Sequence, residues 1–183
     1  MFTLTITFIL SLIVSVDLRS KARKLWNNAP TYFFHDAASS SGKYHPEFDL
    51  GDGGVMRHSL LVAYFAHEIA TAWGMSQREI DLVVIAALIH DVLKRREGEA
   101  QTAFEHPLMA AAYVRETFPG DAEMELVAQA IESHMGKWNT SKYSDAVLPV
   151  PQTMMQLCVS AADMTASRKI LSELGKEEFW KAE

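Results

Sequence analysis

The sequence predicts an all-α fold, a compact helix bundle that forms a single domain. Several stretches carry apolar residues at the spacing of an amphipathic helix, and turn-forming residues separate them. No segment shows a convincing alternation of apolar and polar residues of the kind that marks a strand. The chain has 183 residues, of which 49% are hydrophobic and 22% charged. This length is enough to bury a substantial core, and this composition is ordinary for a globular domain.

Helix-capping and helix-breaking residues set the expected helix boundaries. A first helix is expected over residues 6–28, ending before Pro30. Ser76 and Glu79 have the spacing of a capping box, and Pro107 stands in the first turn of a helix, where proline is tolerated. The remaining helices are expected over residues 55–73, 76–95, 106–118, 121–135, 152–171 and 173–182.

A long loop is expected over residues 30–54, and it is rich in the turn-forming residues Ser, Gly and Asp. Loops of this length are uncommon in compact domains and are often functional, although a plain connector is the alternative. Residues 1–54, the first helix and this loop, are expected to pack on a helical core formed by residues 55–183 within one domain.

Residues 1–16 are almost free of charge, which raises the question of a membrane or export segment. A secretory signal needs a basic start and a small-residue cleavage site, and neither is present. Asp17 and Arg19 end the apolar run before the about 20 residues that a membrane span requires. We therefore expect a buried helix or one that forms a homodimer contact, with membrane association as the less favoured alternative.

Net charge and cysteine content restrict the partners and the compartment. The formal net charge is −6, which argues against a broad basic surface for long nucleic acid but allows a local basic pocket. Cys158 is the only cysteine, so no internal disulfide forms. A reducing compartment fits this, and we predict a cytoplasmic protein.

The most informative residues are polar side chains on otherwise apolar helices. His58 and His134 share helix faces with apolar residues, His90 and Asp91 end the run LVVIAALIHDVLK, and Asp163 lies in the almost uncharged MMQLCVSAADMTAS. A buried carboxylate without a partner costs several kcal/mol. The inward faces offer no Lys or Arg for both aspartates, whereas a metal ion would satisfy them.

A single histidine on an apolar face is more often a hydrogen-bonded core residue than a ligand. His67 illustrates this, because it lies nine residues after His58 and points to the opposite face. We also expect His35 and His45 to be non-ligands. The joint occurrence of His58, His90–Asp91, His106, His134 and Asp163 is different, and it predicts a metal centre.

The order His, His-Asp, His, His, Asp resembles the HD-domain superfamily of metal-dependent phosphohydrolases, over residues 55–170. The dipeptide alone is weak evidence, but VIAALIHDVLK together with GGVMRHSLL and SAADMTASR makes a specific pattern. The pair His106 and His134 resembles the two-metal branch of the superfamily, which includes cyclic-dinucleotide phosphodiesterases. The resemblance implies a helix bundle of the HD-domain type.

By this resemblance, the chain would bind two divalent metal ions. The first ion would be held by His58, His90, Asp91 and Asp163. The second would share Asp91 as a bridge and add His106 and His134. Nitrogen and oxygen ligands without sulfur suit Mn or Fe, with Zn, Co or Ni as alternatives. Such a centre attracts phosphate and acidifies a bridging water, which supplies the attacking hydroxide.

Substrate contacts are expected around this centre. Lys94 completes the pattern HDxxK, which resembles HD phosphodiesterases in which a lysine contacts phosphate, so Asp91 and Lys94 are the candidate catalytic residues. The alternative for Lys94 is a solvated helix end. Arg57 is a further candidate substrate contact, as are Lys43 and Tyr44 if the loop closes over the site as a lid. The alternative for that loop is a structural role.

The predicted activity is hydrolysis of a phosphoester in a nucleotide or a short oligonucleotide. The segment after the fourth histidine reads SHMGKWN and lacks a GYP motif, which argues against cyclic-dinucleotide substrates and leaves a nucleotidase or a deoxynucleotide triphosphohydrolase open. One alternative is a mixed-valent di-iron oxygenase, because some small HD proteins use the same ligands for that chemistry. Another alternative is a sensor that binds nucleotide without turnover.

Overall fold

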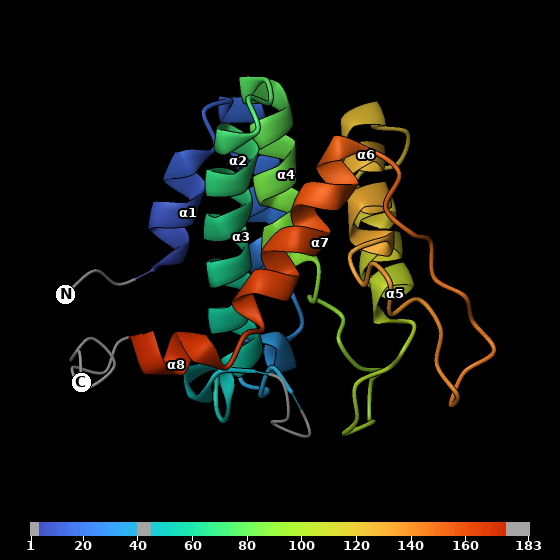
Figure 1. Ribbon diagram of the computed structural model, residues 1–183. Coiled ribbons are helices and arrows are strands. Elements are labelled where there is room, and N and C mark those ends of the chain that lie inside the picture. Colours follow the sequence, from blue (N-terminus) through green and yellow to red (C-terminus); the bar gives the residue numbers. More distant parts are fainter. Residues whose placement is uncertain (1–3, 40–44, 175–183) are drawn as a thin grey trace, which may run out of the picture.

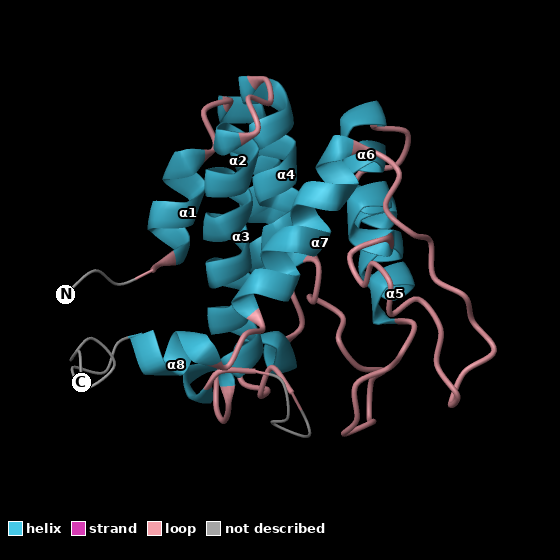
Figure 2. Ribbon diagram, viewed as in Figure 1, coloured by secondary structure: helices cyan, strands magenta, loops and turns pink. Residues whose placement is uncertain are grey.

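The computed structural model, which describes residues 4–39 and 45–174, is entirely helical over that part of the chain (Figures 1 and 2). This confirms the predicted all-α class. The described residues contain an isolated bridge between Ser141 and Ser144 but no strand. In chain order, the helices are α1 Ile6–Leu12, α2 Val16–Asn27, the 3-10 turns η1 Thr31–Phe34 and η2 Glu47–Asp49, α3 Gly54–Ala72, α4 Gln77–Ile89, α5 His106–Thr117, α6 Ala122–Glu132, α7 Met154–Ala166 and α8 Ile170–Leu174.

Helix α4 lies at the centre of the bundle. Every residue from Ile80 to Ile89 is buried, and α4 packs against α1, α2, α3, α6 and α7. Each fully buried Val, Leu or Ile side chain stabilises the fold by about 1.5–3 kcal/mol relative to an exposed one. A helix that is covered on all sides must be apolar on all sides. This explains why His90 and Asp91 follow an uninterrupted apolar run. The predicted capping box at Ser76 and Glu79 starts this helix.

The remaining helices surround α4 in two groups. Helix α3 packs along α4 and also contacts α7, which crosses it diagonally in Figure 1. Helices α5 and α6 pair with each other, and α6 joins the pair to α4 and α7. The connecting loops that follow α4 and α6 both reach the lower end of the bundle in Figure 1.

The N-terminal segment differs from its prediction, because the single helix expected over residues 6–28 is two helices. Thr5 caps α1 and Ser15 caps α2, with Ile13 extended between them. The buried carboxylate of Asp81 accepts hydrogen bonds from the backbone N–H groups of Val14, at 3.0 Å, and Ser15, at 2.8 Å. These bonds replace the intrahelical bonds that a continuous helix would make. Among the helices of the described residues, none has the length and apolar character needed to cross a bilayer.

Two later boundaries also differ. The helix expected over residues 76–95 ends at Ile89, because the chain turns at the His-Asp pair, and Ala103 N–H later donates to Lys94 O at 3.0 Å. The helix expected over residues 152–171 is α7 alone, which starts with a second capping box at Thr153 and stops before Ser167. Helix α8 then begins at Ile170, so the last helix starts earlier than expected, and residues 175–182 of that prediction lie outside the described residues.

Candidate metal centre

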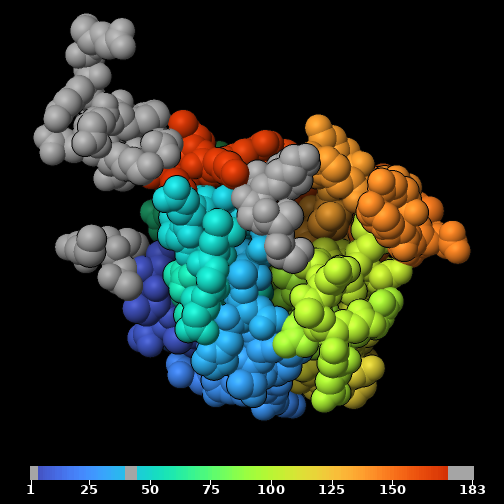
Figure 3. Space-filling model, turned by 90° about the horizontal axis from the view of Figure 1, so that it is seen from below, coloured from blue at the N-terminus to red at the C-terminus, as the bar shows by residue number. Residues whose placement is uncertain are grey.

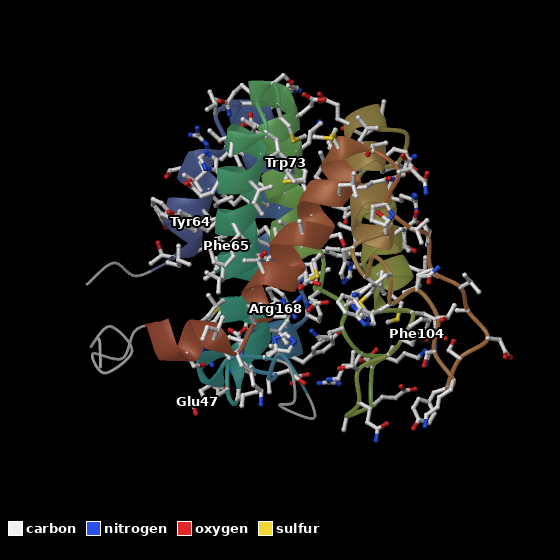
Figure 4. The ribbon with its side chains drawn as sticks, viewed as in Figure 1. Glu47, Tyr64, Phe65, Trp73, Phe104 and Arg168 are labelled. Atoms are coloured by element: carbon white, nitrogen blue, oxygen red, sulfur yellow. The ribbon has the colours of Figure 1, made fainter. Side chains whose placement is uncertain are left out.

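The six residues predicted to bind metal converge at one end of the bundle, where the helices that carry them meet in the lower half of Figure 1. Figure 4 labels Arg168 and Phe104 in the lower half of the same view. At this end α3 and α5 begin, α4 and α6 end, and α7 passes across. The set is His58 near the start of α3, His90 and Asp91 at the end of α4, His106 at the start of α5, His134 just beyond α6, and Asp163 in α7. Within each of three overlapping trios of these residues, the candidate ligand atoms lie within 4.8 Å of one another.

Hydrogen bonds to the outer ring nitrogens orient all four histidines. His90 Nδ1–H donates to Ala87 O at 2.7 Å, and the rings of His106 and His134 make the same bond to the carbonyl three residues earlier, each at 2.8 Å. His58 Nδ1–H donates instead to the Asp49 carboxylate at 3.2 Å. A carbonyl oxygen only accepts, so in His90, His106 and His134 the proton sits on Nδ1, and in the neutral ring the Nε2 lone pair is left for a ligand in the centre. His58 differs, because both of its ring nitrogens face carboxylates, those of Asp49 and Asp163.

The inward-facing atoms are arranged for a cation. His106 Nε2 lies 3.3 Å from His134 Nε2, so in neutral rings two lone pairs face each other. Burial and the neighbouring His90 and His106 lower the pKa of His134 to about 3, which keeps this ring neutral. His90 Nε2 and one oxygen of Asp91 are buried and make no hydrogen bond within the described part of the chain. Buried polar atoms without a partner are rare and costly, and a metal ion would satisfy these.

Two aspartates carry the negative charge of the centre. One Asp91 oxygen lies 3.1 Å from His106 Nε2 and 3.9 Å from His134 Nε2, while the other contacts the Lys94 ammonium. Burial by itself raises the pKa of Asp91, but Lys94 and His90 outweigh it and hold this pKa well below its usual range. Asp163 accepts from His58 Nε2 at 2.9 Å and lies 3.7 Å from His90 Nε2. Burial by itself raises the pKa of Asp163, but the bond from His58 and the neighbouring His90 outweigh it and hold this pKa below its usual range. Both carboxylates are therefore ionised and available as ligands.

Asp49 is a functional candidate that the sequence analysis missed. It is fully buried, and its carboxylate lies 3.2 Å from His58 Nδ1 and 3.5 Å from His45 Nδ1. Burial by itself lowers the pKa of His58, but the bonds to Asp163 and Asp49 raise it to about 9. His45, expected to be a non-ligand, thus stands beside the centre, with its ring centroid 4.7 Å from that of His58. The segment around Asp49 lacks helical periodicity, so no pattern indicated that it is buried.

Of the residues predicted to contact substrate, Lys94 lies at the metal centre and Arg57 is bonded to a loop. Among the described residues, the Lys94 ammonium makes one bond, to Asp91, so it lies at the edge of the centre. The Arg57 guanidinium donates to the carbonyls of Phe48, at 2.6 Å, and Asp52, at 2.7 Å. These bonds hold the preceding loop, and the role of Arg57 as a substrate contact stays a prediction. Lys43 and Tyr44 lie outside the described residues.

The donor set fits divalent metal ions. Three carboxylates, those of Asp49, Asp91 and Asp163, lie around one Lys ammonium and the His58 ring. Four imidazoles and carboxylates without sulfur match the ligands preferred by Mn, Fe, Co, Ni and Zn.

Comparison with known protein families identifies the family of the chain. A family model described as the HD domain matches residues 55–178, which is more than half of the chain and includes all six converging residues. No curated protein and no solved structure matches the chain. HD domains bind divalent metals and make up a superfamily of metal-dependent phosphohydrolases. The chain therefore belongs to the HD domain family.

Proposed function

We propose that this protein hydrolyses a phosphoester bond in a nucleotide or a short oligonucleotide, using two divalent metal ions. The observation that carries the proposal is the ring of inward-facing Nε2 atoms around the ionised Asp91, with His90 Nε2 and Asp91 Oδ1 lacking any hydrogen bond among the described residues. The HD domain match supports the general class of metal-dependent phosphohydrolase.

The six residues divide into two overlapping ligand sets. We assign His58, His90, Asp91 and Asp163 to one ion, and Asp91, His106 and His134 to the other, in keeping with the short distances around Asp163 Oδ1 and Asp91 Oδ1. Mn and Fe are the ions we expect first. When bound, the ions supply Lewis-acid stabilisation of phosphoryl oxygens and a water of lowered pKa.

The protein itself supplies orientation and charge. The carbonyls of Ala87, Ala103 and Ile131 fix three imidazoles, so little reorganisation is needed when a ligand binds. Lys94 is 12% exposed and donates one of its three N–H bonds to Asp91. The other two have no acceptor within the described residues, which supports our assignment of Lys94 as a donor to a phosphate oxygen at the centre.

The first experiment is elemental analysis of protein purified without added metal, combined with a manganese-supplemented screen of phosphoester substrates. About two metals per chain and turnover of a nucleotide are the expected results. Two irons without phosphatase activity would favour the di-iron oxygenase, and binding of nucleotide without turnover by any metal form would favour a sensor. Protein that binds no metal would contradict the proposal, because the proposed reaction requires bound metal ions.

Asp163→Ala is expected to lower the metal content by at least one equivalent per chain, because the substitution removes the carboxylate nearest to His58 and His90. Inductively coupled plasma mass spectrometry of the purified variant measures this directly. Asp145→Ala, at an exposed position, is the matched control and retains full metal. Unchanged metal content in Asp163→Ala would remove Asp163 from the ligand set.

Lys94→Ala is expected to keep both metal ions but to reduce kcat/KM by about 10²-fold, the usual effect of losing one donor to transition-state charge. Steady-state kinetics and metal analysis on the same preparation separate the two effects. Lys142→Ala, an exposed lysine in the loop after α6, serves as the control with wild-type kinetics. If Lys94→Ala has wild-type kinetics, Lys94 has no part in turnover.

A further inference from the structure

A cavity of about 450 Å³ lies next to the metal centre. Its lining includes Asp36, Val55, Lys94, Arg95, Glu99 and Thr102. Lys94 belongs to both places, because it lines the cavity and contacts Asp91. Figure 3 looks onto this end of the molecule, where the yellow-green segment after α4 lies beside the light-blue segment that carries Asp36. A ligand whose phosphate reaches the centre therefore has a space for its remaining atoms.

Arg95 is held rigidly in the wall of this cavity. Its Nε donates to the Asp36 carboxylate at 2.5 Å, and Nη1 donates to Glu99 O at 2.9 Å. The guanidinium also lies over the Tyr32 ring, 4.1 Å from its centroid. The hydroxyl of Tyr32 in turn donates to the Arg95 carbonyl at 2.9 Å. These contacts fix the orientation of a side chain that would otherwise lose much conformational entropy on binding a ligand.

One edge of the Arg95 guanidinium remains available. A guanidinium has five N–H bonds, and the contacts to Asp36 and Glu99 use two of them. Nη2 has no hydrogen-bond partner within the described residues, and Nη1 keeps one N–H bond. The Nη1–Nη2 edge is the planar fork that binds two oxygens of a phosphate or carboxylate. Because Asp36 and Tyr32 hold the guanidinium in place, this fork can bind an anion with little loss of side-chain entropy.

We propose that the cavity binds a mononucleotide-sized ligand with two phosphates, one at the metal centre beside Lys94 and the other at the free edge of Arg95. This inference rests on the proposed function and narrows its substrate class to small nucleotides with a second phosphate. Ligand pockets span about 300–1,000 Å³, and 450 Å³ is at the small end of that range. The cavity thus suits one nucleotide unit better than an oligonucleotide.

The test compares adenosine 3′,5′-bisphosphate with adenosine 5′-monophosphate, by isothermal titration calorimetry on the metal-loaded full chain with phosphate release followed in parallel. The wild-type protein is expected to bind the bisphosphate at least about tenfold more tightly, the usual effect of hydrogen bonds to a charged group. Arg95→Ala should lose this preference and keep its affinity for the monophosphate. Arg96→Ala is the control, because Arg96 is adjacent and exposed and does not line the cavity.

Each result distinguishes recognition from a structural role. Equal wild-type affinity for the two probes, or an equal loss of both in Arg95→Ala, would overturn the assignment of Arg95 even if phosphate release proceeds normally. Conversely, an Arg95-dependent preference without any phosphate release would uphold the cavity and reject hydrolysis. Arg95→Lys keeps the charge but not the fork, and it should recover only part of the preference.

Discussion

Asp91→Ala is expected to abolish phosphoester turnover, with a loss of at least about 10³-fold, and to release metal from both positions. Asp91 is the only residue assigned to both ligand sets, and its oxygens approach three imidazoles and the Lys94 ammonium. Without it, these three imidazoles have no anionic partner in common, and the Lys94 ammonium loses the one bond that it makes to the described residues. Metal analysis and kinetics on the same sample measure both effects.

The controls separate charge from shape at this position. Asp91→Asn keeps the side-chain volume but not the charge, so we expect it to lose metal nearly as completely as the alanine variant. Asp17→Ala removes an exposed carboxylate in the first turn of α2 and should change neither the metal content nor the turnover. Turnover by Asp91→Ala within tenfold of wild type would show that Asp91 does not bridge the ions.

Gly54→Ala is expected to destabilise the fold by about 2–3 kcal/mol, which corresponds to a decrease of about 5–10 °C in Tm. A Cβ at Gly54 would lie 2.0 Å from Asp49 O, 2.7 Å from Ala38 N and 2.9 Å from Ala37 Cα. These are backbone atoms that cannot rotate away. The substitution ordinarily stabilises a helix by about 0.4–1 kcal/mol, so steric overlap reverses its sign here.

Gly54→Ala should also weaken metal binding. The loop that must move carries Asp49, whose carboxylate orients His58, so we expect metal affinity to fall along with stability. Gly74→Ala is the matched control: a Cβ there meets nothing within 4 Å, and only its positive φ of 69° opposes the change. Thermal unfolding should show a smaller loss for Gly74→Ala, with metal content unchanged. An equal Tm for Gly54→Ala and wild type would contradict the close approach of Gly54 to the backbone of Asp49.

Helical periodicity made most of the fold predictable, whereas the grouping of the six residues into one centre followed from the resemblance to the HD-domain superfamily. His90 and Asp91 follow a run that is apolar on every face, and such a run occurs where a helix is enclosed by others. The break near Ile13 was not predictable, because the acceptor for Val14 and Ser15 is Asp81, 66 or more residues away in sequence. Local propensity contains no information about such a contact.

The same limit applies to the residues around the centre. Asp49 lies in a short 3-10 turn, where no periodic pattern separates a buried carboxylate from an exposed one. Arg57 precedes His58 and looked suited to substrate, but the carbonyls that it binds belong to a loop whose path the sequence does not define. Arg95 stands in a cluster of charges, and only its contacts with Asp36 and Tyr32 distinguish it from Arg96.

The way the histidine rings are oriented affects how the centre tolerates mutation. For His90, His106 and His134 the orienting acceptor is a main-chain carbonyl of the same turn, which every amino acid provides. Substitutions at Ala87, Ala103 or Ile131 therefore leave the acceptor in place. His58 Nδ1 depends instead on a side chain, that of Asp49, so a single nucleotide change can remove its acceptor. Among related sequences, we therefore expect more variation in residue type at positions 87, 103 and 131 than at Asp49.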